Sequence, residues 1–137
     1  MIYTQGAIAR TMTPFYGEAA SEKLYRLLDG NIGAVQEYSE AIVAGDTRQQ
    51  HAALAHLTSN ADEIANFLSQ LNPYLQKDIV QGLIATHGAH HVLQINQYKT
   101  KDYAPLGATW PMMRQHVYII ADTLTTALAK QFPSKFL

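Results

Sequence analysis

Three histidines stand close together in the segment GLIATHGAHHVLQI, which covers residues 82–95. His87 and His91 are four residues apart, so on a helix they lie one turn apart on the same face. His90 falls about 60° from His87 and about 100° from His91 at 3.6 residues per turn, nearer the edge of that face. Two imidazoles at this spacing can ligate a divalent transition metal such as Zn, Cu, Fe or Ni, or can hydrogen-bond to buried polar groups and water.

Helices must position these histidines, because apolar residues recur three and four apart through most of the chain. Gly45 suits a left-handed helix end, and Asp46 or Thr47 suits the N-cap of the helix that follows. The pattern predicts a short helix over residues 2–12, long helices over about 17–44, 47–71, 74–99 and 111–131, and a loop over 100–111.

Four long helices joined mainly by short links predict an all-α fold. We expect a single domain, residues 1–137, built as an up-down-up-down four-helix bundle with a short extra N-terminal helix. In that bundle Asn31, His87, His91 and His116 all fall about twelve to sixteen residues from the same end of their helices, which places them in one middle layer. Buried polar groups need partners, because an unpaired donor or acceptor costs a few kcal/mol.

Two interpretations of this layer follow from the residue types. In the first, His87, His91 and His116 ligate a metal ion, and a carboxylate from Glu63 or Asp62, or a water, completes the coordination. In the second, the imidazoles are neutral and form hydrogen bonds with buried polar groups nearby. Their partners would then be Asn31, Thr58, Gln94 and a buried water.

The composition excludes several classes of function. The chain has 137 residues, 47% of them apolar, 15% charged and none cysteine, and a net charge of −1. Thiolate sites, disulfides and cysteine nucleophiles are therefore absent, and no basic field is present to bind nucleic acid or an anionic membrane. An HExxH metalloprotease motif would need glutamate where Gly88 stands, and no Glu-x-x-His pair for a di-iron site is present.

The N-terminal segment lacks the pattern of a signal peptide, and the apolar runs are too short to span a membrane. We therefore expect a cytoplasmic protein without a membrane partner, or an exported one if a signal segment has been removed.

Four segments of the chain carry a family pattern. They are PFYGEAASEKLYRLL (14–28), NADEIANFLSQLNP (60–73), GLIATHGAHHVLQI (82–95) and ADTLTTALAKQFPSKF (121–136). Together they resemble a family of small, functionally uncharacterised bacterial helical-bundle proteins, over nearly the whole chain from about Gln5 to Phe136. The resemblance implies a helical bundle and no particular activity.

Three features differ from the family pattern. Asn31 stands where relatives have a histidine, which weakens a metal site built on that position, and His91 stands where relatives often have threonine. His87 matches the family histidine. Relatives also have a longer N-terminal helical segment, so a partner chain could cover a groove left open here, and we expect a homodimer on that ground.

The leading functional hypothesis is a non-enzymatic binding or structural module that binds a metal ion or a small ligand at the histidine layer. One alternative is a metal-dependent enzyme resembling the DinB-type bundles, in which three histidines hold a divalent metal and His51 or His56 replaces His116. Another is a pure oligomerisation module without a ligand.

Overall fold

The structure is a computed structural model that describes residues 2–137, with side chains from Gln5 onward. Over these residues the chain is helical and contains no strand, so the prediction of an all-α fold is confirmed. The helices in chain order are α1 (Ile2–Thr11), α2 (Thr13–Tyr16), α3 (Glu18–Ala44), α4 (Thr47–Leu71), α5 (Lys77–Lys99), α6 (Tyr103–Gln131) and the 3₁₀ turn η1 (Pro133–Phe136).

The predicted junction between the first two long helices is confirmed. Gly45 ends α3 in the left-handed conformation, with φ at 69°, which glycine adopts without steric cost. The Asp46 carboxylate then accepts the backbone N–H of Gln49 at 3.0 Å and caps α4. Two adjacent residues therefore determine this turn: Gly45 ends α3, and Asp46 caps α4.

The loop predicted over residues 100–111 is wrong, because α6 already begins at Tyr103. Pro105 lies in the first turn, where its missing N–H has no intrahelical partner to lose. Pro111 lies inside α6 and removes one helical hydrogen bond. The buried Thr109 hydroxyl donates to Gln97 Oε1 on α5 at 2.9 Å. This contact with α5 stabilises the helical turns between Pro105 and Pro111, where the prolines had suggested a loop.

The helix predicted from residue 74 begins later, at Lys77. The side chain of Asn72 accepts the N–H of Tyr74 at 2.9 Å, and its backbone carbonyl accepts the N–H of Leu75 at 3.1 Å. These bonds form a local turn that competes with the helix.

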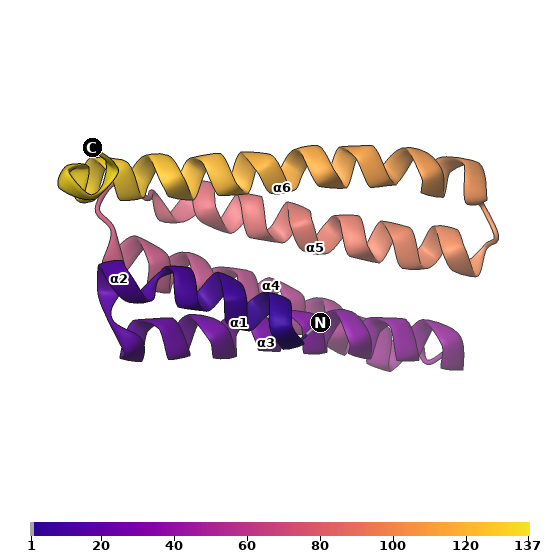
Figure 1. Cartoon of the computed structure of the whole chain (residues 1–137). Helices are drawn as coiled ribbons and strands as arrows, with labels where there is room; N and C mark the ends of the chain where they lie inside the picture. The colour runs from indigo at the N-terminus through magenta and orange to yellow at the C-terminus, as the bar shows by residue number, and fades with distance from the viewer. Residues whose placement is uncertain (1) are drawn as a thin grey trace.

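The long helices lie side by side (Figure 1), and α4 packs mainly against α3 and α5. Helix α1 packs along α3, and the main neighbour of α6 is α5. Helices α3 and α6 therefore do not pack closely against each other along their length.

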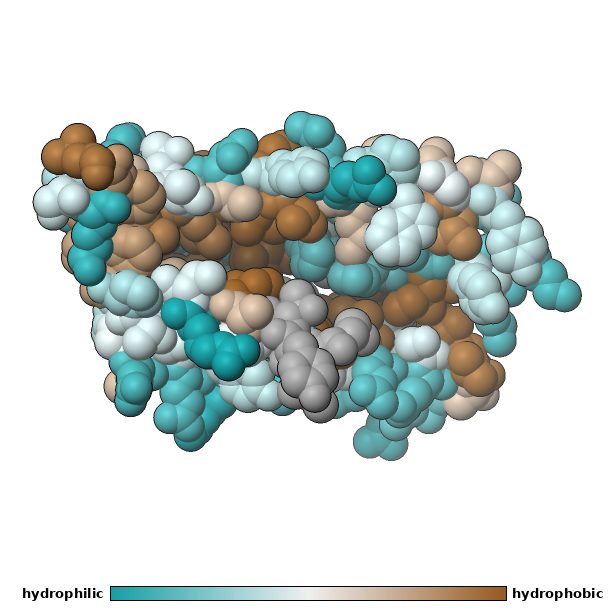
Figure 2. Space-filling model, viewed as in Figure 1, coloured by the Kyte–Doolittle hydropathy of each residue, from teal (hydrophilic) through white to brown (hydrophobic). Residues whose placement is uncertain are grey.

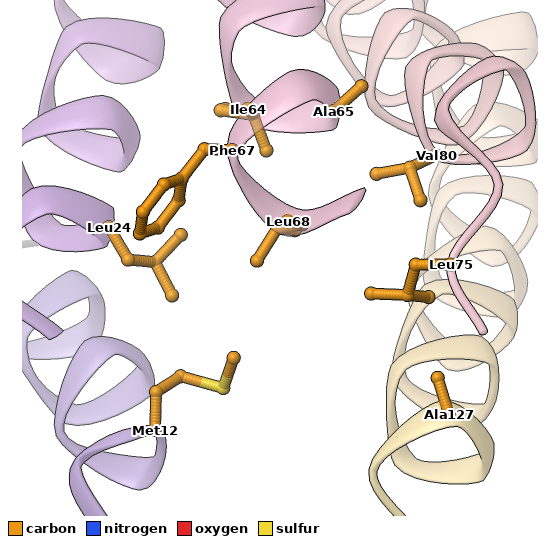
Figure 3. Close-up of a cluster of buried hydrophobic side chains, with 9 residues drawn as sticks. All are labelled: Met12, Leu24, Ile64, Ala65, Phe67, Leu68, Leu75, Val80 and Ala127. Atoms are coloured by element: carbon orange, nitrogen blue, oxygen red, sulfur yellow. The ribbon is translucent and has the colours of Figure 1, made fainter. Parts of the chain in front are cut away.

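The main apolar core lies toward the end of the molecule where α2 and η1 meet (Figures 1 and 3). Its buried members come from four long helices and the adjoining turns: Met12, Leu24, Ile64, Ala65, Phe67, Leu68, Leu75, Val80 and Ala127. Leu54, Tyr98 and Val117, which fall on the apolar stripes of their helices, are exposed.

A polar and aromatic clamp closes the core end. Tyr16 Oη donates to Gln131 Oε1 at 2.6 Å and accepts from Asn72 Nδ2 at 3.1 Å, and Gln131 Nε2 donates to the Leu71 carbonyl at 2.9 Å. Burial raises the pKa of the Tyr16 hydroxyl, and the Asn72 bond partly offsets that rise. The rings of Phe15 and Phe132 pack beside this network, as do Phe136 and Lys135. The clamp stabilises the fold and leaves no polar atom of this network free for chemistry.

Candidate ligand-binding site

The paired histidines on α5 face each other across one helical turn. Their Nε2 atoms are 3.3 Å apart, and their rings meet edge to face with centroids 4.8 Å apart. A hydrogen bond between two Nε2 atoms requires that only one of them carries the proton. The prediction that His87 and His91 share one helix face is therefore confirmed, and each imidazole fixes the tautomer of the other.

His116 of the predicted layer forms a second pair with His90. The rings of His90 and His116 meet edge to face with centroids 5.2 Å apart, and His116 Nε2 donates to the Leu83 carbonyl at 2.8 Å. His116 thus joins α6 to α5, and its Nε2 is already engaged. The structure places it beside His90 and bonds it to the backbone of α5.

Burial keeps the imidazoles of α5 neutral near pH 7. Burial first, and then positive charge on His91, His116 and His90 when these are protonated, lowers the pKa of His87 from 6.5 to about 4. Burial and the charge of His90 lower the pKa of His91, and burial and the charge of His116 lower that of His90. The site therefore offers uncharged donors and acceptors at physiological pH.

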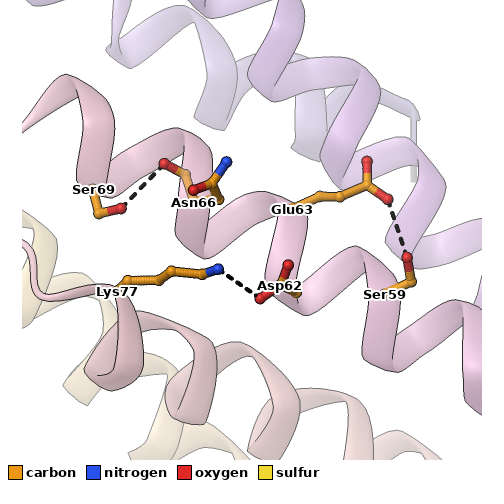
Figure 4. A network of polar contacts seen from close by, with 6 residues as sticks. All are labelled: Ser59, Asp62, Glu63, Asn66, Ser69 and Lys77. Carbon is orange, nitrogen blue, oxygen red and sulfur yellow. Dashed lines mark hydrogen bonds and ion pairs between the residues drawn. The ribbon is translucent and has the colours of Figure 1, made fainter.

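The predicted carboxylate ligands lie elsewhere. Glu63 is exposed and accepts from Ser59 at 3.3 Å, and Asp62 pairs with Lys77 at 2.9 Å (Figure 4). Within residues 2–137, no group of three or more histidine, aspartate and glutamate side chains is placed so that it could hold a metal ion. The structure brings together His87 and His91 from the predicted set of His87, His91, His116 and Glu63.

Two of the polar neighbours predicted for the histidines, Asn31 and Thr58, are engaged elsewhere, whereas Gln94 Nε2 is buried without a partner. Asn31 Nδ2 donates to Asn60 Oδ1 at 2.9 Å, and Asn60 Nδ2 donates to the Leu27 carbonyl at 2.8 Å, so these amides join α3 to α4. The Thr58 hydroxyl donates to the Leu54 carbonyl of its own helix. Neither amide nor hydroxyl supplies His87 Nδ1, which is buried and has no hydrogen-bond partner.

A cavity of about 590 Å³ opens beside the paired histidines. This volume falls within the range of about 300–1,000 Å³ that is usual for small-molecule sites. Figure 2 shows hydrophobic side chains at the floor of the hollow between the upper and lower helices of the view. The lining residues come from α1, α3, α4 and α5: Gln5, Ile8, Leu28, Asn31, Ile32, Val35, Gln36, Ser39, Ile64, Ile84, His87, His91 and Ile95.

Two residues of this lining carry a polar atom that lacks a partner. Gln5 Oε1 and His87 Nδ1 are both buried without a hydrogen bond, and Gln5 is only 5% exposed. An unpaired buried polar atom costs about 1–3 kcal/mol, so a ligand that supplies the missing bond is favoured. We call this space, walled mainly by α3 and α5, the histidine cavity.

A second cavity of about 590 Å³ adjoins the first at Ser39 and Ile95, which line both. It lies where the C-terminal turns of α3 and α5 meet the first turns of α6, and we call it the lysine cavity. Its lining is Ser39, Ile42, Val43, Gln94, Ile95, Tyr98, Lys99, Lys101, Tyr103, Leu106 and Trp110. Sequence reasoning missed this site because residues 100–111 were expected to form a loop, although the segment YKTKDY already combines aromatic and basic residues.

The whole surface is larger than that of a compact protein of this size. The accessible area is 8519 Å², whereas a compact monomer of 15.2 kDa exposes about 7,100 Å². The excess agrees with the two open cavities and with large apolar residues exposed on α6, among them Trp110 and Tyr118. The arrangement is suited to binding, since apolar walls and neutral imidazoles favour an uncharged group.

No helix within residues 2–137 combines the length and the apolar character needed to cross a bilayer. Comparison of the chain with protein families, with curated proteins and with solved structures finds no match.

Proposed function

We propose that this chain is a non-enzymatic binding protein whose histidine cavity takes an apolar small molecule bearing one uncharged hydrogen-bonding group. The observation that carries the proposal is the open apolar space of about 590 Å³ whose lining includes Gln5 and His87, each with a buried polar atom that has no partner.

The unpartnered atoms define the chemistry of the bound group. Gln5 Oε1 is an acceptor, so the ligand must donate. His87 Nδ1 either donates or accepts, depending on which tautomer its contact with His91 selects. A hydroxyl or a secondary amine can satisfy both atoms, whereas a hydrocarbon can satisfy neither.

We infer that the four long helices form an up-down-up-down bundle that is opened between α3 and α6. Short links between α3 and α4, between α4 and α5, and between α5 and α6 support this topology, as does their side-by-side arrangement in Figure 1. The opening gives a ligand its route to the histidine cavity.

Fluorescence of N-phenyl-1-naphthylamine tests the proposal. This probe is apolar, carries one N–H donor and emits strongly only when it is removed from water. We expect saturable binding and displacement by 1-decanol, whose hydroxyl meets the polar atoms, but much weaker displacement by decane. Equal displacement by the two, or no saturable binding, would overturn the proposal.

Two variants locate the probe. Val35→Arg brings a charged side chain into the histidine cavity, and Ile95→Trp fills the junction of the two cavities, so each should lower probe affinity at least tenfold. Val117→Arg is the matched control, because Val117 is an exposed apolar residue on α6 outside both linings. Thermal unfolding of each variant reports whether it is folded. Unchanged affinity in a folded cavity variant would contradict the assignment.

A divalent transition metal on His87 and His91 is the second candidate. Zn–N bonds of about 2.0–2.1 Å in tetrahedral geometry separate two ligand nitrogens by about 3.3–3.4 Å. The Nε2 atoms are 3.3 Å apart, and both can ligate an ion once the proton shared between them has moved to an Nδ1 atom. Water or a group of the bound molecule would complete the coordination.

Elemental analysis of protein purified without a histidine tag tests the metal, followed by calorimetric titration with Zn²⁺. We expect one ion per chain in the parent, none in the His87→Ala/His91→Ala double variant, and one in a control that replaces the exposed His51 and His56 by alanine. Equal uptake by the two double variants would assign binding to the surface. The homodimer remains a prediction that sedimentation equilibrium can test, and exposed apolar residues on α6 support it.

A further inference from the structure

We propose that the lysine cavity binds a carboxylate, so that the ligand is a single-chain hydroxy acid lying along both cavities. Its hydroxyl meets His87 and Gln5, and its carboxylate meets Gln94, Lys99 and Lys101. This proposal rests on the proposed function of the histidine cavity and adds the second polar group of the ligand.

The two cavities form one path along the helices. Residues that line it recur three and four apart on α3 (Leu28, Ile32, Val35, Ser39 and Ile42) and on α5 (Ile84, His87, His91, Ile95 and Tyr98). The first and last residues of each series are fourteen positions apart, about 21 Å at 1.5 Å per residue. The walls between the polar ends are largely apolar, which suits an extended hydrocarbon chain.

Hydrogen-bond donors gather at the far end of this path. Gln94 Nε2 is buried without a partner, and Lys99 and Lys101 line the same cavity. The Lys99 ammonium donates one bond, to the Ile42 carbonyl at 3.2 Å, and has further donors available. No carboxylate is part of this lining among the described residues. An unpaired amide donor beside two ammonium groups matches an anionic oxygen acid.

The backbone of Lys101 points to a role for its side chain. Its φ is 59°, and Lys101 is the one non-glycine residue with positive φ in the described part of the chain. The position ends α5 with N–H bonds from Lys101 to the Tyr98 carbonyl and from Asp102 to the Gln97 carbonyl, a turn in which glycine is favoured. A lysine held in this strained conformation at the rim of a cavity suggests that its charge is used there.

The spacing of the polar groups selects the ligand. His87 and Gln94 are seven residues apart on one helix, about 10 Å along its axis. The carboxylate and the hydroxyl of extended 10-hydroxyoctadecanoate are separated by a comparable distance. The remaining hydrocarbon tail continues toward Ile84 and Leu28, at the end of the histidine cavity.

Trp110 gives a direct readout, because it is the single tryptophan of the chain, lines the lysine cavity and is 58% exposed. The parent protein is titrated with 10-hydroxyoctadecanoate, its methyl ester and octadecanoate, each below its micelle concentration. We expect a blue shift of Trp110 emission with the hydroxy acid, and affinities about tenfold weaker for the ester and for octadecanoate.

Substitutions at Lys101 separate charge from backbone strain. Lys101→Asn tolerates the left-handed conformation but removes the charge, and it should weaken the hydroxy acid about tenfold while leaving the ester unchanged. Lys101→Arg should retain the affinity, and Lys130→Gln, at the other end of α6, is the control for net charge.

The outcomes distinguish the two proposals. If the acid and the ester bind equally and Lys101→Asn changes neither, the lysine cavity does not bind the carboxylate, although the histidine cavity still binds its ligand. If neither compound displaces N-phenyl-1-naphthylamine while 1-decanol does, the hydroxy acid is not the ligand, whereas absence of saturable probe binding overturns the proposed function itself. Binding only above the micelle concentration would assign the interaction to a lipid aggregate and contradict the single-chain ligand.

Discussion

His87 Nε2 and His91 Nε2 lie 3.3 Å apart on the wall of an apolar cavity, and the Nδ1 atom of His87 has no partner. The pair is held neutral by burial and is only partly satisfied within the chain. Binding of a second molecule is favoured when that molecule supplies the hydrogen bond that the histidine pair lacks. This relationship underlies both the ligand and the metal proposals.

The depressed pKa of His87 predicts that stability depends on pH. The unfolded chain takes up this proton near pH 6.5, and the folded chain only near pH 4, so the unfolded state binds more protons between these values. The free energy of unfolding should therefore rise as pH increases from about 4 to 6.5 and level off above. Allowing for solvent screening, His87 contributes about 2 kcal/mol to this rise.

Urea unfolding between pH 4 and 7.5 measures the effect. His87→Gln should flatten most of the slope, and His51→Gln, at an exposed histidine, is the control that should leave most of it in place. His91 and His90 add to the slope in the same direction, because their pKa values are also lowered. A parent protein whose stability falls across this range would contradict the burial of His87.

Glycine in place of Lys101 should stabilise the protein. The substitution relieves the left-handed conformation of a residue with a side chain, worth about 1 kcal/mol. Lys130→Gly, in the last turn of α6, should destabilise by about as much, because glycine is unfavourable within a helix. Chemical unfolding of the two variants should thus give changes of opposite sign, and a destabilised Lys101→Gly variant would show that the lysine side chain supports the fold.

Asn72→Ala should destabilise the core end by about 2–4 kcal/mol. Asn72 is 1% exposed, and its amide serves both the Tyr16 hydroxyl and the N–H of Tyr74, which would be left unsatisfied. Asn66→Ala, at an exposed position of α4, should change stability by no more than about 0.5 kcal/mol. Similar losses in the two variants would argue against the clamp.

Two helical glycines should respond differently to alanine. A Cβ at Gly82 meets nothing within 4 Å, so Gly82→Ala should stabilise α5 by about 0.5–1 kcal/mol. A Cβ at Gly30 would lie 3.3 Å from Asn60 Nδ2, which already donates to the Leu27 carbonyl. Gly30→Ala should therefore gain less or destabilise, and thermal unfolding of the two variants gives the comparison.

Much of the fold could be predicted from preferences of residues that are close together in the sequence. The spacing of His87 and His91, the left-handed Gly45 and the cap at Asp46 depend on neighbouring residues alone, and all three are confirmed. The start of α6 was not predicted, because Pro105 and Pro111 suggest a break and only the buried bond from Thr109 to Gln97 on α5 accounts for the continued helix. Contacts between helices override local preference there.

The site was predictable only in part for the same reason. Counting residues placed Asn31 and His116 at the level of the paired histidines, but register along a helix does not give the direction in which a side chain points. Asn31 turns to Asn60, and His116 bonds to the backbone of α5. The two cavities depend on how several helices pack against one another, which no short segment encodes.

Nuclear Overhauser contacts between 1-decanol and isotope-labelled protein test the central claim most directly. We predict contacts from the methylenes of decanol to the methyl groups of Ile32, Val35 and Ile84, which line the histidine cavity. We predict none to the exposed Val43 or Val117, which lie outside that cavity. Contacts confined to exposed methyl groups, or no contacts at saturating decanol, would contradict the account.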